Sequence, residues 1–178
     1  MKALLAICLS LAASAWAEEI PPALASPNKA YSVIEVRDGI KPAHYVIQSQ
    51  PDGTPLGVCP DDARFDSTPA KVIWSPDSRF VAIETRMTRH GGRAEIWRLD
   101  GRKATLLKTD YPTEAGNFYF SPTRWLSGVD LEFGVIGHDE KAAEPENPIK
   151  TYTLIMRFDR KKGIFSFLRS TKATYGHF

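Results

Sequence analysis

The chain alternates between short runs of apolar, β-branched or aromatic residues and short stretches rich in Pro, Asp and Gly. After residue 17, no segment of ten or more residues shows the 3.6-residue period of an amphipathic helix. Runs of this length, separated by turn-forming residues, are typical of strands. The pattern therefore predicts an all-β protein with strands at residues 31–36, 44–48, 71–74, 79–85, 94–99, 104–107, 117–120, 129–136, 151–158 and 164–168.

The connections between these runs carry the residues that tight turns require. Pro51-Asp52-Gly53 and Ser75-Pro76-Asp77-Ser78 combine proline with Asp, Ser or Gly, and Gly91-Gly92 and Asp100-Gly101 are hairpin signals. Consecutive strands are therefore predicted to pair as antiparallel hairpins. The connection at 137–150 differs, because it is long, polar and contains two prolines. We expect a mobile excursion there.

Two parts of the chain repeat each other. Residues 74–83 are echoed by 125–133, and residues 96–103 are echoed by 155–162. Each unit has an aromatic strand, a tight turn, a second apolar strand, a third strand ending in Asp, and a basic turn into a fourth. The repeat predicts antiparallel four-stranded, blade-like sheets. Approximate units at 70–108 and 117–169 follow a partial one at 31–58.

The first repeat unit resembles the repeat of TolB-type, WD-like β-propellers. The resemblance lies in Trp74, the Ser75-Pro76-Asp77 turn and the apolar run Val81-Ala82-Ile83, while Ser78 stands where these repeats usually have glycine. It implies blades of antiparallel strands, but a closed propeller typically has about 4–8 blades. We therefore expect one all-β domain over 31–178, preceded by an extended segment at 18–30. Its blades form an incomplete propeller or a sandwich, and its open sheet edges would allow homo-oligomers.

The first 17 residues have the features of a bacterial-type signal peptide: Lys2, an apolar run and the small-residue motif Ala15-Trp16-Ala17. Cleavage after Ala17 predicts a periplasmic or secreted protein with no membrane span. Removing those 17 of 178 residues leaves 161, with 22 basic side chains, one fewer than the original 23, against 21 acidic ones. This balance argues against a nucleic-acid partner, which is bound through many basic contacts to phosphate.

The sequence contains no motif that carries chemistry. After cleavage Cys59 is the only cysteine, and its apolar neighbours indicate an inert buried thiol. His138-Asp139-Glu140 is the densest group of potential ligands, but four Cys or His ligands at a zinc-binding spacing are lacking. His90 is read as part of a charged hairpin tip, and the acidic group at 61–66 as a polar turn. We therefore predict no catalytic residue, no cofactor and no metal.

The leading functional hypothesis is an exported binding or assembly module that contacts another envelope or secreted protein. Aromatic and Arg side chains at strand ends favour such contacts. The candidates around the entry to the second unit are Tyr111, Phe118, Tyr119 and Arg124, with core packing as the alternative for each. Two other hypotheses stay open. One is an enzyme or enzyme inhibitor that uses the loop 137–150, and the other is a self-assembling structural protein.

Overall fold

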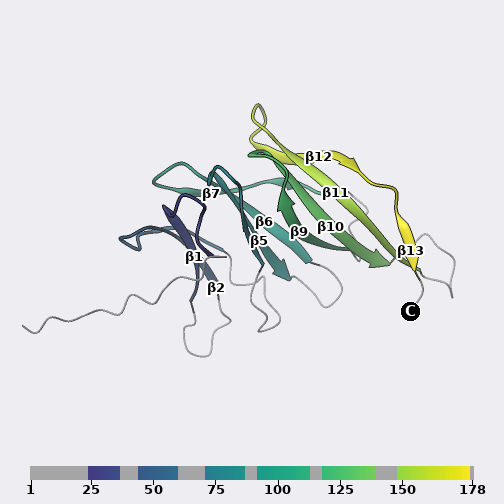
Figure 1. Ribbon diagram of the computed structural model, residues 1–178, viewed down its shortest axis with the longest axis horizontal. Helices are drawn as coiled ribbons and strands as arrows, with labels where there is room; N and C mark the ends of the chain where they lie inside the picture. The colour runs from purple at the N-terminus through teal and green to yellow at the C-terminus, as the bar shows by residue number, and fades with distance from the viewer. Residues whose placement is uncertain are drawn as a thin grey trace, which may run out of the picture.

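The computed structural model of the protein describes residues 24–36, 44–59, 71–86, 92–112, 118–138 and 148–176. This part of the chain consists of strands and turns, without an α-helix (Figure 1). Each of the ten predicted runs overlaps a strand, and three short strands, β3, β8 and β13, were not predicted. The all-β prediction is therefore confirmed.

The strands fall into three consecutive blade-like units. The first contains β1 (Tyr31–Val36), β2 (His44–Ser49) and β3 (Pro55–Val58). The second contains β4 (Val72–Trp74), β5 (Phe80–Arg86), β6 (Gly92–Leu99) and β7 (Ala104–Leu107). The third contains β9 (Phe118–Trp125), β10 (Asp130–His138), β11 (Ile149–Asp159) and β12 (Ile164–Ser170). The short strands β8 (Thr109–Asp110) and β13 (Thr174–Gly176) lie at its edges.

Within each unit, consecutive strands pair antiparallel in the order of the chain. The second and third units are joined by a single parallel pairing, between Gly92 of β6 and Tyr119 of β9. β8 pairs parallel with β12, and β13 pairs antiparallel with the start of β11. The result is a three-stranded sheet beside a mixed ten-stranded one, an open arrangement as expected for an incomplete propeller or a sandwich.

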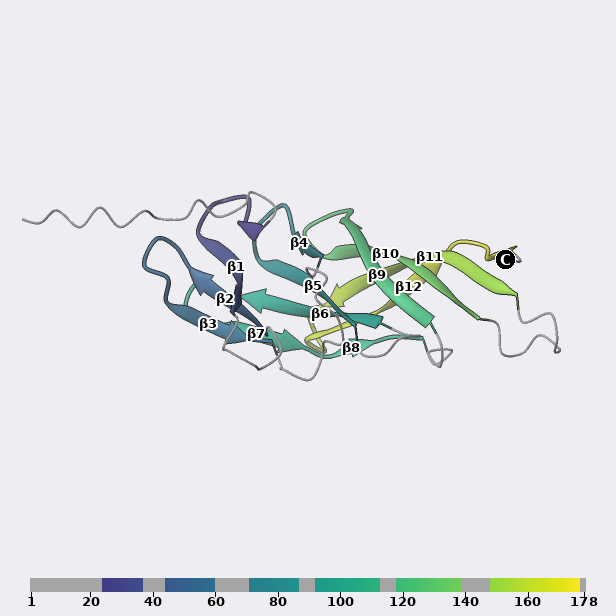
Figure 2. The same cartoon turned by 90° about the horizontal axis from the view of Figure 1, so that it is seen from below.

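The middle unit is apolar on both faces because both are covered. Along β5, successive side chains point to opposite faces: Phe80 and Ala82 join a core shared with the third unit. Val81 and Ile83 join a second core, shared with the first unit. Figure 2 shows the units following one another along the molecule. This explains why the sequence of β5 is continuously apolar rather than alternating.

The same turn precedes β1 of the first unit and β5 of the second. In Ser75-Pro76-Asp77-Ser78, the Ser75 hydroxyl accepts from the Phe80 N–H (2.9 Å) and donates to Asp77 (2.7 Å). In the segment that begins at Ser26, the Ser26 hydroxyl accepts from the Tyr31 N–H (3.0 Å) and donates to Asn28 (2.8 Å). The first unit therefore carries the complete turn, and residues 26–30 differ from the extended segment predicted there.

The two turns also have the same backbone conformation at one position. Lys29 and Ser78 both have a φ of 58°, in the left-handed region that favours glycine. The glycine usual in the resembled repeats at the position of Ser78 would suit this φ. The Ser78 hydroxyl instead accepts a hydrogen bond from the Asn28 N–H (3.1 Å), which ties the two turns together.

A tryptophan at the end of the first strand of the second and third units fastens each to the unit before it. The Trp74 indole N–H donates to the Leu24 carbonyl (3.3 Å), and the Trp125 indole N–H donates to the Ile73 carbonyl (3.0 Å). Leu24 and Ile73 lie 49 positions apart, as do Ser26 and Ser75. The two acceptors are therefore equivalent positions of the repeat.

An aromatic ring of the preceding unit completes each junction. Trp74 stacks on Tyr31 with ring centroids 6.3 Å apart, and Trp125 stacks on Phe80 at 5.7 Å. We call this combination of indole hydrogen bond and stacked ring the tryptophan latch. Because the latch recurs at both junctions, the second unit packs on the first in the same way as the third packs on the second.

Several sequence predictions lie partly or wholly outside the described residues: the signal peptide at 1–17, His90, the acidic group at 61–66 and most of the excursion. The boundaries of the excursion are corrected, because β10 and β11 continue to a pairing between His138 and Ile149. Residues 137, 138, 149 and 150 are thus strand residues. No helix in the described ranges is long and apolar enough to cross a membrane.

Candidate functional site: the open face of the last unit

One face of the third unit has no further unit packed on it in the described part of the chain. In the second unit, the equivalent face carries Phe80, Ala82, Ala94 and Ile96, all buried in the shared core. The strand registers, Phe80 opposite Arg98 and Asp130 opposite Arg157, align the two units. We call the resulting surface of the third unit the open face; its residues are Arg124, Asp130, Glu132, Gly134, Ile136, Thr151, Thr153, Ile155 and Arg157.

Two ion pairs occupy the end of the open face nearest the tight turns. Arg157 binds both oxygens of Asp130, with nitrogen–oxygen distances of 2.6 and 2.9 Å. Arg124 binds both oxygens of Glu132, at 3.0 and 3.2 Å. Such two-point pairs have a defined geometry. Two ion pairs thus stand where the second unit has the apolar residues Phe80 and Ala82.

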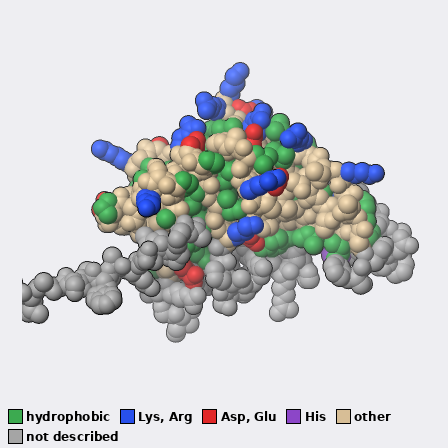
Figure 3. Space-filling view, in the orientation of Figure 1, with side chains coloured by type: hydrophobic (Ala, Val, Ile, Leu, Met, Phe, Trp, Pro, Cys, Tyr) green, Lys and Arg blue, Asp and Glu red, His purple; other side chains and the backbone are tan. Residues whose placement is uncertain are grey.

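The electrostatics of both carboxylates follow from these contacts. The hydrogen bond from Arg157 lowers the pKa of Asp130, and burial opposes this only in part. The hydrogen bond from Arg124 likewise lowers the pKa of Glu132, helped by the Thr123 hydroxyl. On the side of the molecule shown in Figure 3, basic and acidic side chains are interspersed with apolar ones.

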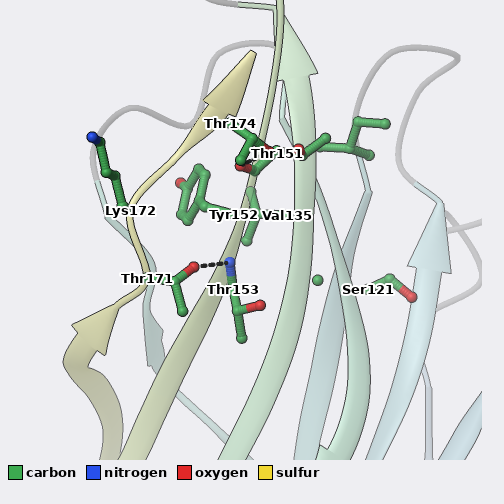
Figure 4. Close-up of a pocket in the computed structure, with 10 residues that line it drawn as sticks. Ser121, Val135, Thr151, Tyr152, Thr153, Thr171, Lys172 and Thr174 are labelled. Carbon is green, nitrogen blue, oxygen red and sulfur yellow. Dashed lines mark hydrogen bonds between the residues drawn. The ribbon is translucent and has the colours of Figure 1, made fainter. Parts of the chain in front are cut away.

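A hollow of about 460 Å³ occupies the other end of the open face and extends to the β12–β13 connection (Figure 4). Its described lining combines hydroxyl groups and the cation of Lys172 with the apolar side chains of Val135 and Ile136, and none of these described residues is acidic. The residues that carry these groups are Ser121, Thr151, Thr153, Thr171, Lys172 and Thr174. Thr151 and Thr153 point to the same face because they lie two residues apart in β11.

Some of these groups are already hydrogen-bonded. The Thr151 and Thr174 hydroxyls bond to each other (2.7 Å), and the Thr171 hydroxyl accepts from the Thr153 N–H (2.9 Å). The Thr153 hydroxyl has no partner among the described residues and points away from Thr171, toward the Ser121 side of the hollow (Figure 4). The Lys172 side chain, at the rim, is exposed. The Ser121 hydroxyl is occupied as well, because it donates to Glu84 (3.0 Å). The unused donors of the hollow are therefore those of Thr153, Thr171 and Lys172.

Of the four predicted partner residues, one lies in the core and a second packs against it. Phe118 is 7% exposed and lies in the core shared by the second and third units. The Tyr111 ring packs 4.9 Å from Phe120, and its hydroxyl donates to the Ala94 carbonyl (2.8 Å). Burial raises the pKa of Tyr111. Both side chains thus have a structural role that leaves little of them for a partner.

The other two predicted residues lie at the junction and on the open face. Tyr119 donates a hydrogen bond to the Glu84 carboxylate, and its ring packs against Gly92. Arg124 is the most exposed of the four, with 69% of its side chain accessible while it pairs with Glu132. Partner binding by any of the four stays a prediction, and Arg124 is the one whose position suits it best.

Sequence reasoning did not identify the hollow. The Thr-x-Thr spacing at 151–153 indicates two hydroxyls on one face of a strand, but Thr171 and Thr174 reach the hollow only through the pairing of β13 with β11. In the described ranges, no group of three or more His, Cys, Asp or Glu residues could hold a metal ion. Cys59 is buried and not part of a disulfide bond, and its burial agrees with its apolar neighbours in the sequence.

No protein-family model matches the chain, and the comparison with curated proteins finds no match.

Proposed function

We propose that this protein is an exported binding module, related to TolB-type repeats, that contacts another envelope or secreted protein through the ion-paired part of its open face. One observation supports the proposal. In the second unit this face is apolar and covered by the third unit. In the third unit the equivalent face carries two ion pairs, and no further unit in the described part of the chain covers it. The proposed export rests on the signal-like residues 1–17.

The polarity of the face favours a reversible partner. A permanent interface is largely apolar, whereas reversible interfaces keep polar rims and charged pairs that tolerate water. Arg is also enriched among residues that dominate binding energy. An Arg that already pairs with a carboxylate of its own face is held in place, so less side-chain entropy is lost when a partner binds it.

Site-specific photo-crosslinking in the producing cell tests the proposal. A photoreactive residue would replace Thr123 beside the ion pairs or, as a control, Lys161 in the β11–β12 turn, since both positions are exposed. The captured protein would then be purified and its affinity measured directly. We expect capture from position 123, none from 161, and loss of affinity of about tenfold or more for Arg124→Glu.

A variant that exchanges the charges separates the partner contact from folding. Arg124→Glu with Glu132→Arg restores the ion pair within the face while reversing its polarity toward a partner. Folding should therefore recover in the double variant, but binding should not. Equal capture from positions 123 and 161, or unchanged affinity of Arg124→Glu, would contradict the assignment of this face.

A further inference from the structure

We infer that the hollow on the open face binds a small hydroxylated carboxylic acid, with the ligand carboxylate taking the place of a glutamate that the first two units possess. The inference concerns a different part of the open face from the ion pairs, and it does not depend on the protein partner proposed above.

The repeat shows which side chain is missing. Glu35 and Glu84 occupy equivalent positions of β1 and β5, 49 residues apart. The strand register places Gly134 of β10 at the same position, because Glu84 lies opposite Ala94 as Gly134 lies opposite Thr153. Two units therefore have a carboxylate at this point, and the third has no side chain.

In the first two units, the glutamate is a hydrogen-bond acceptor. Glu84 accepts from the Tyr119 hydroxyl and from the Ser121 hydroxyl (3.0 Å), both on the first strand of the next unit. Glu35 lies within 3.4 Å of the Tyr45 hydroxyl. At this position of the repeat, a carboxylate thus meets hydroxyl donors. Around Gly134 hydroxyl groups are present, but the carboxylate is absent.

The donors in the hollow fit an oxyanion. Thr153 lies directly opposite Gly134 in the sheet, and its hydroxyl has no partner among the described residues. The Thr171 hydroxyl accepts from the Thr153 N–H, which leaves its own hydrogen free to donate. Lys172, whose side chain extends outward from the rim in Figure 4, adds a positive charge nearby. None of the described residues that line the hollow is acidic, although the Ser121 hydroxyl among them is held by Glu84. Charge-assisted hydrogen bonds of this kind are stronger than neutral ones.

The rest of the lining indicates what the part of the ligand beyond its carboxylate should be. The hollow of about 460 Å³ lies within the usual range for small-molecule sites, about 300–1,000 Å³. The paired Thr151 and Thr174 hydroxyls lie farther along the hollow and can exchange hydrogen bonds with hydroxyl groups of a ligand. A sugar acid, with one carboxylate on a hydroxylated ring, combines the two features.

Glucuronate is the probe, and glucose and acetate are its matched controls. Titrations of isotope-labelled protein, followed by amide chemical shifts, should show glucuronate saturating the amides of Gly134, Thr153 and Thr171. We expect binding to weaken about tenfold in Thr153→Val, which removes a donor, and to weaken also in Lys172→Gln, which removes the positive charge at the rim. Lys161→Gln, an exposed change in the β11–β12 turn, should bind as the parent protein does.

Restoring the repeat glutamate gives the sharpest variant. A Cβ at Gly134 would have its nearest neighbour, a Thr123 methyl carbon, at 3.5 Å, an ordinary contact, so the Cβ of Gly134→Glu fits. Its carboxylate should fill the site and abolish glucuronate binding. Leu126→Glu, which adds the same charge at an exposed position outside the hollow, should not.

Three results would overturn the inference: no saturable shifts with glucuronate, equal affinity for glucose, or equal affinity for acetate. The first would exclude the site, the second the role of the carboxylate, and the third the role of the hydroxylated ring. Should Gly134→Glu fail to fold, Thr153→Val and Lys172→Gln still test the site, because Thr153 is half-exposed and Lys172 is exposed.

Discussion

Replacing Trp125 by Phe tests the tryptophan latch. The change removes the indole N–H that donates to the Ile73 carbonyl (3.0 Å) but keeps an aromatic ring against Phe80. Trp125 is 9% exposed, so water replaces the lost donor poorly. An acceptor left without its partner in such a place costs about 1–3 kcal/mol. For a domain of this size, each kcal/mol lowers the melting temperature by about 2–4 °C.

The equivalent change in the other junction provides the matched comparison. Trp74→Phe removes a longer hydrogen bond, 3.3 Å to the Leu24 carbonyl, so its cost should be smaller than that of Trp125→Phe. Urea unfolding measures both free energies. Far-UV circular dichroism is the appropriate probe, because the change itself removes a fluorophore. The slope of free energy against urea should stay unchanged, since the exposed surface is the same.

A change of less than about 0.5 kcal/mol in Trp125→Phe, the usual size of a surface substitution, would refute the argument. It would mean that the ring stack, rather than the hydrogen bond, holds the second and third units together. Trp125→Leu, which removes the aromatic ring as well, would then show the large loss instead.

Three further predictions follow from individual contacts. Gly92→Ala should destabilise the protein by about 2 kcal/mol or more, because the new Cβ would lie 2.3 Å from the Tyr119 ring; thermal unfolding measures this, and a near-neutral effect would contradict the packing. Lys29→Gly should raise the free energy of unfolding by up to about 1 kcal/mol, because it relieves a φ of 58° at an exposed residue; a loss in urea unfolding would contradict this. Arg157→Gln should lower the free energy of unfolding slightly at pH 7, as expected for an exposed ion pair. The folded-state pKa of Asp130 is lowered, so this contribution is present above its unfolded value of 3.8 and lost as pH falls through the folded value; the cost should therefore vanish in urea unfolding at low pH, and a pH-independent cost would contradict the ion pair.

Much of the fold was predictable because strands and turns leave local signals. The strands that sequence reasoning missed lack those signals: β3 has the sequence Pro-Leu-Gly-Val, in which Pro and Gly weaken a strand pattern. β8 and β13 have two and three residues, too few for a period to show. They exist because neighbouring strands offer unpaired backbone groups, and this is a property of the assembled sheet.

The first unit was only partly predicted, although its signal was present. The segment Ser26-Pro27-Asn28 repeats Ser75-Pro76-Asp77 with a conservative change, and it lacks the tryptophan that marks the other units. The open face was even harder to predict from the sequence. Its ion pairs join β9 to β10 and β10 to β11, so they require the strand register. Opposite charges eight and 27 residues apart have no sequence pattern that pairs them.

The missing tryptophan also explains why the stack of units stays open. A tryptophan latch needs an indole from one unit and an aromatic ring from the unit before it. Trp74 corresponds to Ala25 in the first unit, 49 residues earlier, so that unit has no indole to offer. Phe80 corresponds to Asp130 in the third unit, which is held by Arg157 and offers no ring. Neither end face can therefore form the contact that joins the units internally.

Repeat arrays are kept soluble by terminal units with polar outer faces, and the ion-paired open face provides one here. Head-to-tail association of copies through the same contact would require both positions to change, whereas a partner of different chemistry can bind the open face as it stands.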